Sequence, residues 1–254
     1  MGLLSERFVI DTIPVEVRRN NRRRTRIGMV FDPSGYVIMD APMDTSEAEI
    51  RSIVSEHYRW LRYRLTKVQE AYERFPALHY ENGEIVHYLG AAFVLCVKSG
   101  PKKSIVCDES RNDQLPLFSY LPRGELRLTL AATDSGSIRD ALNGWFRERA
   151  QAVFAERLER WVSLPWLDNG LPAWSHSFMR SQWGSCSTNG KISLNTHLIK
   201  TPIELIDYVL LHELCHLKHH NHGKRFYSLM SFHMPDWESR RKHLNRYLPV
   251  LVQD

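Results

Sequence analysis

The chain has 254 residues, of which 43% are hydrophobic and 25% charged, and its formal net charge is +5. This composition is typical of a globular protein and excludes a collagenous, low-complexity or largely disordered chain. The longest apolar run, LGAAFVLCV at 89–97, is too short to cross a bilayer as a helix, and the net charge is too small to require a nucleic-acid partner.

The N-terminal residues carry charge before the apolar core of a signal peptide can develop, at Glu6, Arg7 and Asp11. The four cysteines are scattered and form no C-x-x-C pair. We therefore expect a cytoplasmic protein with reduced thiols and no membrane partner.

Residues 8–42 alternate in the manner of β-strands, and the turn sequence DPSG between MVF and YVIM predicts a hairpin. Residues 45–72 then place apolar side chains three and four positions apart. This spacing predicts one amphipathic helix, capped by Thr45 or Ser46.

An arginine cluster lies between the first strand-like segments, within residues 18–26. Its six members are Arg18, Arg19, Arg22, Arg23, Arg24 and Arg26. One interpretation is a solvated edge that resists aggregation. The other is a weak contact surface for anions or nucleic acid, although no aromatic residue is interleaved with these arginines.

Two further strands are predicted by EIVHYLG and AAFVLCVKS, which meet at Gly90. The segment 99–124 is rich in turn formers and charge and reads as an elaborated loop before the strand GELRLTLAA. Residues 134–162 carry the longest helical pattern, with one apolar stripe.

Residues 210–226, LLHELCHLKHHNHGKRF, contain five of the twelve histidines. Thr201, Pro202 and Glu204 are typical of a helix start with a capping box. His212 and His216 are four apart, so both imidazoles lie on one face of this helix, with Glu213 beside them. H-E-x-x-H is the signature of zinc hydrolases, in which the imidazoles hold Zn²⁺ and the glutamate takes a proton from the attacking water.

A catalytic zinc site needs a third protein ligand, for which His222 is the first candidate. The resulting spacing H-E-x-x-H-x5-H equals that of metzincin proteases, and it requires the helix to end and turn, which we expect at His220-Asn221 with a left-handed asparagine. The alternative third ligand is a carboxylate further along the chain, Glu238 or Asp236. His219 and His220 are expected to be solvated or to support the ligands without binding the ion.

A second group of polar residues lies upstream in FMRSQWGSCSTNGKISLNT at 178–196. Taken alone, it predicts a hairpin with a packed tryptophan. Together with the histidine helix, the motifs R-S-x-W-G-S-C-S, G-K-I-S-L-N, N-H-G-x-x-F and P-D-W resemble the YgjP-like, SprT-like metal-dependent hydrolases. The resemblance is specific over residues 174–250 and looser over the N-terminal half.

The resemblance implies an α+β fold in two parts. Residues 1–130 would form a β-rich region with one helix at 45–72, and residues 131–254 a zincin-like metal-binding catalytic domain. One zinc ion would be held by His212, His216 and His222, with Glu213 as the catalytic base. Four further motif residues would line the metal cleft as substrate-binding residues: Arg180, Trp183, Ser185 and Asn195.

The same resemblance leaves the substrate open. A peptidase would bind an extended peptide or protein along an edge strand, for which KISLN is the candidate. Some members of the family are described as UTP pyrophosphatases, so a nucleoside triphosphate is the alternative substrate. The third hypothesis, a non-catalytic zinc-stabilised adaptor on nucleic acid, is disfavoured by Glu213, because a structural site has no use for a base.

Overall fold

The computed structural model describes residues 4–19, 27–32, 35–109, 122–168 and 170–252. Tertiary contacts divide the chain into two compact units, Met1–Pro76 and Ala77–Asp254. The sequence placed this boundary at residue 130 instead. The difference arises because the sheet formed within residues 83–130 packs against the long helix that follows it, so these strands belong to the C-terminal unit.

The N-terminal unit contains a four-stranded sheet made of β1 (Leu4–Ile10), β2 (Ile13–Arg19), β3 (Gly28–Phe31) and β4 (Val37–Ala41), in the order β1-β2-β4-β3. β1 and β2 form an antiparallel hairpin, β2 and β4 are parallel, and β3 pairs with β4 in the hairpin predicted from DPSG. Gly35 in that turn has φ +95°, a conformation that glycine adopts without strain.

Two helices, α1 (Glu47–Glu56) and α2 (Tyr58–Arg74), follow the sheet in place of the single helix predicted for 45–72. Ser46 caps α1 by accepting a hydrogen bond from the Glu49 N–H, and the chain leaves helical geometry at His57. The apolar positions Ile50, Val54, Leu61 and Leu65 are all buried against the sheet. They would share one face in an unbroken helix too, so their periodicity cannot reveal the break.

The arginine cluster is only partly described. Arg18 pairs with Glu16, which also pairs with Arg7, and Arg19 pairs with Glu6. The other four members, within residues 20–26, lie outside the described residues. The anion-binding interpretation of this cluster therefore stays a prediction.

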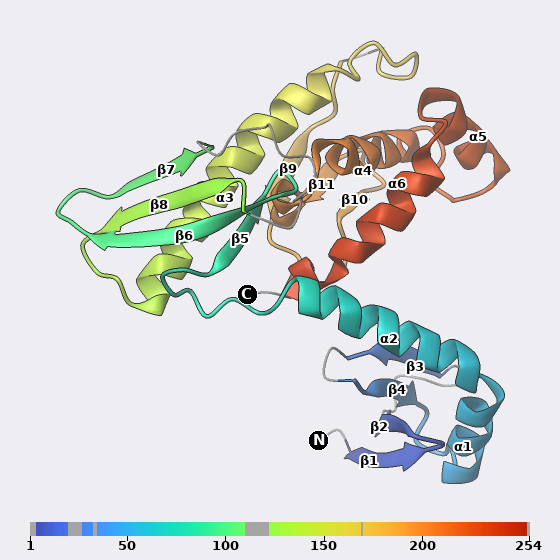
Figure 1. Cartoon of the computed structure of the whole chain (residues 1–254). Coiled ribbons are helices and arrows are strands. Elements are labelled where there is room, and N and C mark those ends of the chain that lie inside the picture. The colour runs from blue at the N-terminus through green and yellow to red at the C-terminus, as the bar shows by residue number, and fades with distance from the viewer. Residues whose placement is uncertain (1–3, 20–26, 33–34, 110–121, 169, 253–254) are drawn as a thin grey trace. The chain divides into compact units, whose positions relative to one another are not determined.

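The C-terminal unit begins with a second four-stranded sheet of β5 (Ile85–Tyr88), β6 (Ala91–Ser99), β7 (Ser104–Asp108) and β8 (Gly124–Leu130), ordered β5-β6-β8-β7. Leu126, Leu128 and Leu130 of β8 are buried and alternate with more exposed residues, as expected for a sheet covered on one face. Helix α3 (Ser135–Glu159) contacts β8 on this sheet (Figure 1). Asp134 caps α3 through the Ser137 N–H.

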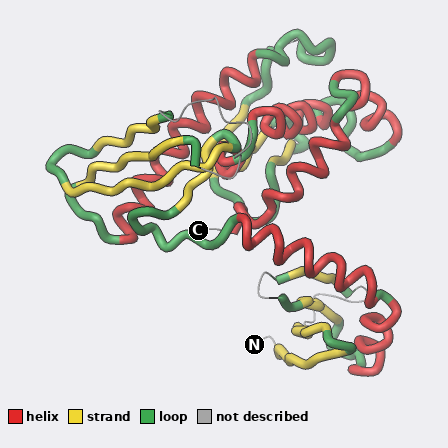
Figure 2. The backbone as a smooth tube through the Cα atoms, viewed as in Figure 1, coloured by secondary structure: helices red, strands yellow, loops and turns green. Residues whose placement is uncertain are grey.

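Residues 174–195 form a small sheet of three strands, β9 (Trp174–Ser177), β10 (Gly184–Cys186) and β11 (Ile192–Asn195), in the order β10-β11-β9. The 3-10 helix η2 (Thr196–Lys200) leads from β11 into α4 (Ile203–His216). Figure 2 shows that the chain is then mainly helical, with α5 (Lys224–His233), α6 (Trp237–Leu244) and the 3-10 helix η3 (Asn245–Val252).

The turn between β5 and β6 touches the start of α4. The N–H groups of Leu89 and Gly90 donate to the carbonyls of Ile199 and Lys200. Gly90 has φ +82°, and a Cβ there would lie 2.6 Å from Pro202 Cγ, so only glycine fits this approach. The first sheet of this unit thereby holds the chain at the point where the histidine helix begins.

Within the part of the chain that the structure describes, no helix combines the length and the apolar character needed to span a membrane.

Candidate metal centre

Helix α4 presents the first two candidate ligands. From Leu205 to Leu214 its apolar residues are buried, which fixes the orientation of the helix and leaves His212 and His216 on the more accessible side. The two imidazoles lie one turn apart with ring centroids separated by 4.9 Å. The expected capping box is not formed, because the Thr201 hydroxyl donates to the Leu198 carbonyl and Pro202 occupies the cap position.

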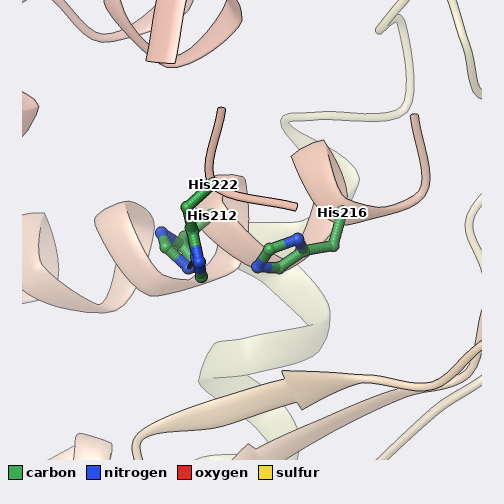
Figure 3. Close-up of side chains that lie close together, drawn as sticks. All are labelled: His212, His216 and His222. Carbon is green, nitrogen blue, oxygen red and sulfur yellow. Dashed lines mark hydrogen bonds between the residues drawn. The ribbon is translucent and has the colours of Figure 1, made fainter. Parts of the chain in front are cut away.

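His222 comes from the segment between α4 and α5 and completes a group of three histidines (Figure 3). Its Nε2 lies 3.0 Å from His212 Nε2, and its ring centroid lies 4.6 Å from that of His216. One ligand nitrogen from each residue falls within 4.8 Å of the others. The sequence-predicted ligands are thus brought together around one point.

The helix ends earlier than the sequence predicts. α4 stops at His216, and the N–H groups of Lys218 and His219 both bond to the Cys215 carbonyl in the turn that follows. Asn221 does not have positive φ, so the expected left-handed asparagine is wrong. The return of the chain is built from tightened hydrogen bonds at the helix end, without a left-handed residue.

These three residues fit a divalent metal ion such as zinc. Ligand nitrogens 2.0–2.1 Å from a tetrahedral zinc lie roughly 3.3 Å apart, close to the His212–His222 separation. His216 Nδ1 is 3.1 Å from the His219 carbonyl, which can only accept, so this nitrogen carries the proton and Nε2 is left free as a ligand. Burial lowers the pKa of His212 to about 3, so its imidazole is neutral, as a metal ligand must be.

The Phe226 side chain packs against all three histidines. Its side chain is fully buried, and its ring centroid lies 5.0 Å from His212, 4.7 Å from His216 and 4.8 Å from His222. One aromatic ring therefore packs against all three imidazoles and restricts their rotation. No role was predicted for Phe226 from the sequence, although it is the final residue of the motif N-H-G-x-x-F and follows His222 by four residues.

His222 receives further support from an aromatic stack. Tyr227 lies parallel to His222 at 6.2 Å and to Trp237 at 5.0 Å, and the Arg241 guanidinium lies 5.0 Å from the Trp237 ring. This stack connects α5 and α6 to His222, the member of the histidine group that is not on α4. It explains how an exposed histidine in a short turn is held in place.

Glu213 lies beside the histidines and is 5% exposed. Burial raises the pKa of this carboxyl to about 8. A cation held by the neighbouring imidazoles would act in the opposite direction, because positive charge favours the carboxylate. A carboxyl poised between these influences can both accept and return a proton near neutral pH.

Strand β10 packs against Glu213 through a glycine. A Cβ on Gly184 would lie 2.8 Å from Glu213 Oε1 and 3.0 Å from its Cγ, closer than side-chain contacts allow. Glycine at this position therefore leaves the space that the carboxylate occupies. β10 forms the edge of its sheet, next to β11.

The strand proposed for peptide pairing must be corrected. The segment KISLN forms β11, which lies in the centre of the sheet, paired with β10 on one side and β9 on the other. Its backbone groups are already used by these neighbours. Among the described strands, the edge of this sheet that contacts α4 is β10, which contains Ser185.

The four residues expected to bind substrate have different environments. Arg180 is exposed and has no carboxylate partner among the described residues, while Ser185 and Trp183 are half-buried on or beside β10. Asn195 is fully buried, accepts from the Met179 and His197 N–H groups and donates to the carbonyls of Met179 and Gln182. Its amide holds the chain before β10 in place, and its burial leaves no exposed side-chain surface for the substrate contact predicted from the sequence.

The two carboxylates considered as alternative third ligands are not part of the histidine group. Asp236 pairs with Arg240, and Glu238 is exposed on the wall of a cavity of about 880 Å³ that His222 also lines. Among the described residues, neither carboxylate belongs to the group that could hold an ion. His219 contributes its backbone carbonyl to His216, and His220 is exposed.

Tyr208 is a second residue beside the histidines whose role was not predicted from the sequence. It lies one turn before His212 on the same helix, with ring centroids 5.9 Å apart, and burial raises the pKa of its phenol to about 12. A protonated hydroxyl beside the histidines can donate a hydrogen bond. Its role could have been predicted from the sequence, because Tyr208 and His212 are four residues apart and therefore lie on the same face of the helix.

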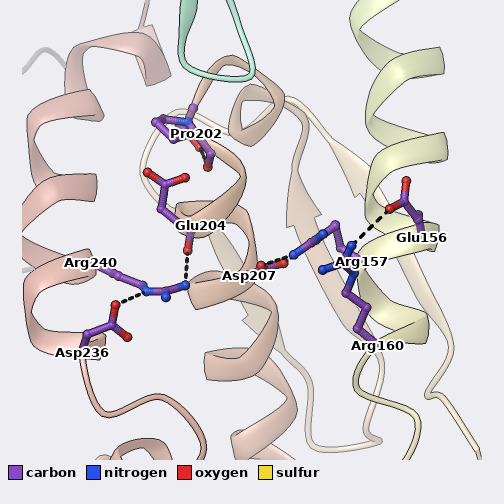
Figure 4. Close-up of polar contacts among 9 residues, drawn as sticks. Glu156, Arg157, Arg160, Pro202, Glu204, Asp207, Asp236 and Arg240 are labelled. Carbon is purple, nitrogen blue, oxygen red and sulfur yellow. Dashed lines mark hydrogen bonds and ion pairs between the residues drawn. The ribbon is translucent and has the colours of Figure 1, made fainter. Parts of the chain in front are cut away.

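One ion pair and one hydrogen bond attach α4 to its neighbouring helices (Figure 4). Arg157 of α3 makes a two-pronged, largely buried pair with Asp207 of α4. Arg240 of α6 pairs with Asp236 and donates to the Glu204 carbonyl at 3.1 Å. The helix that carries both ligands and Glu213 is thereby attached to two neighbouring helices.

A solved structure, the metallopeptidase zymogen of Methanocaldococcus jannaschii jannalysin, is 21% identical and aligns over 39% of this chain and 96% of that chain, with a TM-score of 0.32. No curated protein sequence matches this chain. The profile of the YgjP-like metallopeptidase domain matches residues 25–247, so the chain belongs to the YgjP-like family, whose members carry a metallopeptidase domain.

Proposed function

We propose that the protein is a zinc-dependent peptidase with one zinc ion per chain. The observation that carries this proposal is the convergence of His212, His216 and His222 beside the buried Glu213. A zinc ion held there would act as a Lewis acid on the scissile carbonyl group. Membership of a metallopeptidase family supports a divalent metal and a hydrolytic reaction.

Glu213 acts as the general base. Its carboxylate takes the proton from the attacking water and returns it to the leaving amine. The Tyr208 hydroxyl, one turn before His212, donates a hydrogen bond to the carbonyl oxygen as negative charge develops there. The contact with Gly184 keeps the carboxylate against β10.

The substrate is an extended peptide that pairs with the free edge of β10. Such pairing uses backbone hydrogen bonds and places the peptide next to Glu213, because β10 packs directly on α4. Ser185 and Trp183 flank this edge, and the exposed Arg180 provides a cation for a substrate carboxylate.

A second candidate is hydrolysis of a nucleoside triphosphate at the same site. It is favoured by the cavity beside His222, whose wall includes Lys224 and Arg241. Both side chains can bind phosphate oxygens. A non-catalytic adaptor is the weakest candidate, because it gives no reason for a buried glutamate beside the ligands.

The test combines metal analysis of the purified protein with assays on a peptide library and on nucleoside triphosphates. We expect one zinc per chain, peptide cleavage by the wild type, and no cleavage by Glu213→Gln at unchanged zinc content. Triphosphate hydrolysis without peptide cleavage would favour the second candidate. A fully active Glu213→Gln protein would exclude the assigned base.

A further inference from the structure

The exposed side of helix α2 in the N-terminal unit combines cations with aromatic rings. We call it the α2 face, and it consists of Arg59, Trp60, Arg62, Tyr63 and Arg64. Trp60 is 49% exposed and Tyr63 61% exposed, which is unusual for rings of this size. No acidic residue occurs between positions 57 and 69, so nothing on this part of the helix neutralises the cations.

The arginines of the α2 face differ from the others in this unit. Arg62 donates to the hydroxyls of Thr12 and Tyr58, Arg64 lies 5.7 Å from the Phe31 ring, and Arg59 has no carboxylate partner among the described residues. Elsewhere in the unit the described arginine side chains pair with carboxylates: Arg7 and Arg18 with Glu16, Arg19 with Glu6, and Arg51 with Glu47. Among the arginines whose side chains the structure describes in this unit, those of the α2 face are the ones without a carboxylate partner.

Trp60 is positioned by its neighbours and adjoins open space. Its ring meets Phe31 edge-on at 5.6 Å, and Phe31 in turn lies beneath Arg64. A cavity of about 740 Å³ opens at the joint between α1 and α2, and its wall includes Trp60 and Arg59 together with the acidic Glu56. A planar group entering this cavity would meet an aromatic surface already held in place, next to a guanidinium group.

We propose that the α2 face binds single-stranded nucleic acid. Arg59, Arg62 and Arg64 bind the phosphates, and Trp60 and Tyr63 stack on the bases. Unpaired bases are needed because stacking on a side chain requires a free base face, which a duplex does not expose. An acidic polypeptide would satisfy the arginines but would leave the two exposed rings without a matching group.

This inference concerns a surface other than the candidate metal centre and does not depend on hydrolysis. Its test is therefore a binding measurement on the full-length protein. Fluorescence anisotropy with a labelled oligothymidylate reports the affinity directly. With three phosphates neutralised, log K should fall with log salt at a slope of about −2, a loss of about 20-fold in affinity between 50 and 200 mM salt.

The charge test uses the triple variant Arg59→Ala, Arg62→Ala, Arg64→Ala, for which we expect the salt dependence and most of the affinity to disappear. The matched control removes the same charge from the C-terminal unit, where three exposed arginines already have carboxylate partners: Arg123, Arg127 and Arg139. Equal affinities of the two triple variants would overturn the proposal, because net charge alone would then explain binding.

The stacking test uses Trp60→Ala, which should weaken oligothymidylate binding by about tenfold, and Trp60→Phe, which should restore most of it. Thermal unfolding of each variant shows whether the N-terminal unit remains folded. Equal binding of a duplex of the same length, or of poly-glutamate, would contradict the assignment, as would a Trp60→Ala protein that is folded and binds normally.

Discussion

Replacing Gly184 with alanine tests the contact between β10 and the proposed base. The added Cβ would lie 2.8 Å from Glu213 Oε1, so the carboxylate must retreat by about 0.6 Å to reach ordinary van der Waals contact. Overpacking at a buried position costs about 1–3 kcal/mol of the free energy of unfolding. Displacement of a reacting group by up to an ångström reduces turnover by about 10²-fold, so we expect a loss of between ten- and a hundredfold.

The measurement is the cleavage rate of a library-selected peptide by protein of known zinc content. Zinc binding should persist, because Glu213 is not one of the three ligand residues. Gly144→Ala is the matched control, since a Cβ at that helical position meets nothing within 4 Å, and it should leave activity unchanged. A zinc-loaded Gly184→Ala protein with the wild-type rate would refute the reasoning that this contact positions the base.

Three further changes test the support of the site. Phe226→Ala should lower zinc affinity by about 10- to 100-fold in a chelator competition, because the ring that packs on all three imidazoles is lost, whereas Phe226→Leu should lower it less. Arg157→Met should cost about 3 kcal/mol in urea unfolding by leaving Asp207 unpaired, and the double variant with Asp207→Leu should recover part of that loss. Asn195→Ala should cost about 2–3 kcal/mol in the same assay, because buried backbone groups lose their partners, while an undiminished stability would contradict the role assigned to its amide.

The ligand pair and the base could be predicted because their relation is local. Within one helix the positions 212, 213 and 216 have a fixed geometry, and the sequence needs only to form that helix. His222 was predicted from spacing, but the turn that carries it was not. Its conformation depends on hydrogen bonds from residues 218 and 219 to Cys215, which no single residue type specifies.

The features that differ from the sequence-based predictions have one cause. Each depends on contacts between residues far apart in the chain, and the pattern of residues along the sequence does not show such contacts. Asn195 was expected to contact the substrate because it is a polar residue in a motif. The sequence does not show whether such a residue bonds to a substrate or to other groups of the protein. The structure shows four internal hydrogen bonds and complete burial. The contact of Gly184 with Glu213 and the central position of β11 likewise depend on pairing between distant segments.

The domain boundary shows the same limit. Strands before residue 130 and the helix after it are separate patterns in the sequence, and only their packing shows that they form one unit. The break at His57 is also invisible, since the buried positions on either side keep one helical phase. The spacing of apolar residues in a sequence predicts which side of a helix or strand is buried. It does not predict which other helices and strands pack against that side.

The contacts of Arg157 and Arg240 with α4 restrict the rotation of this helix about its own axis. They attach to the helix from two sides (Figure 4). An imidazole nitrogen at the surface of the helix lies about 6 Å from that axis, so a rotation of about ten degrees would carry it by about 1 Å. Zinc–ligand distances tolerate about 0.2 Å, so two arginines that are not ligands themselves would set the angular precision of a zinc site built on these histidines.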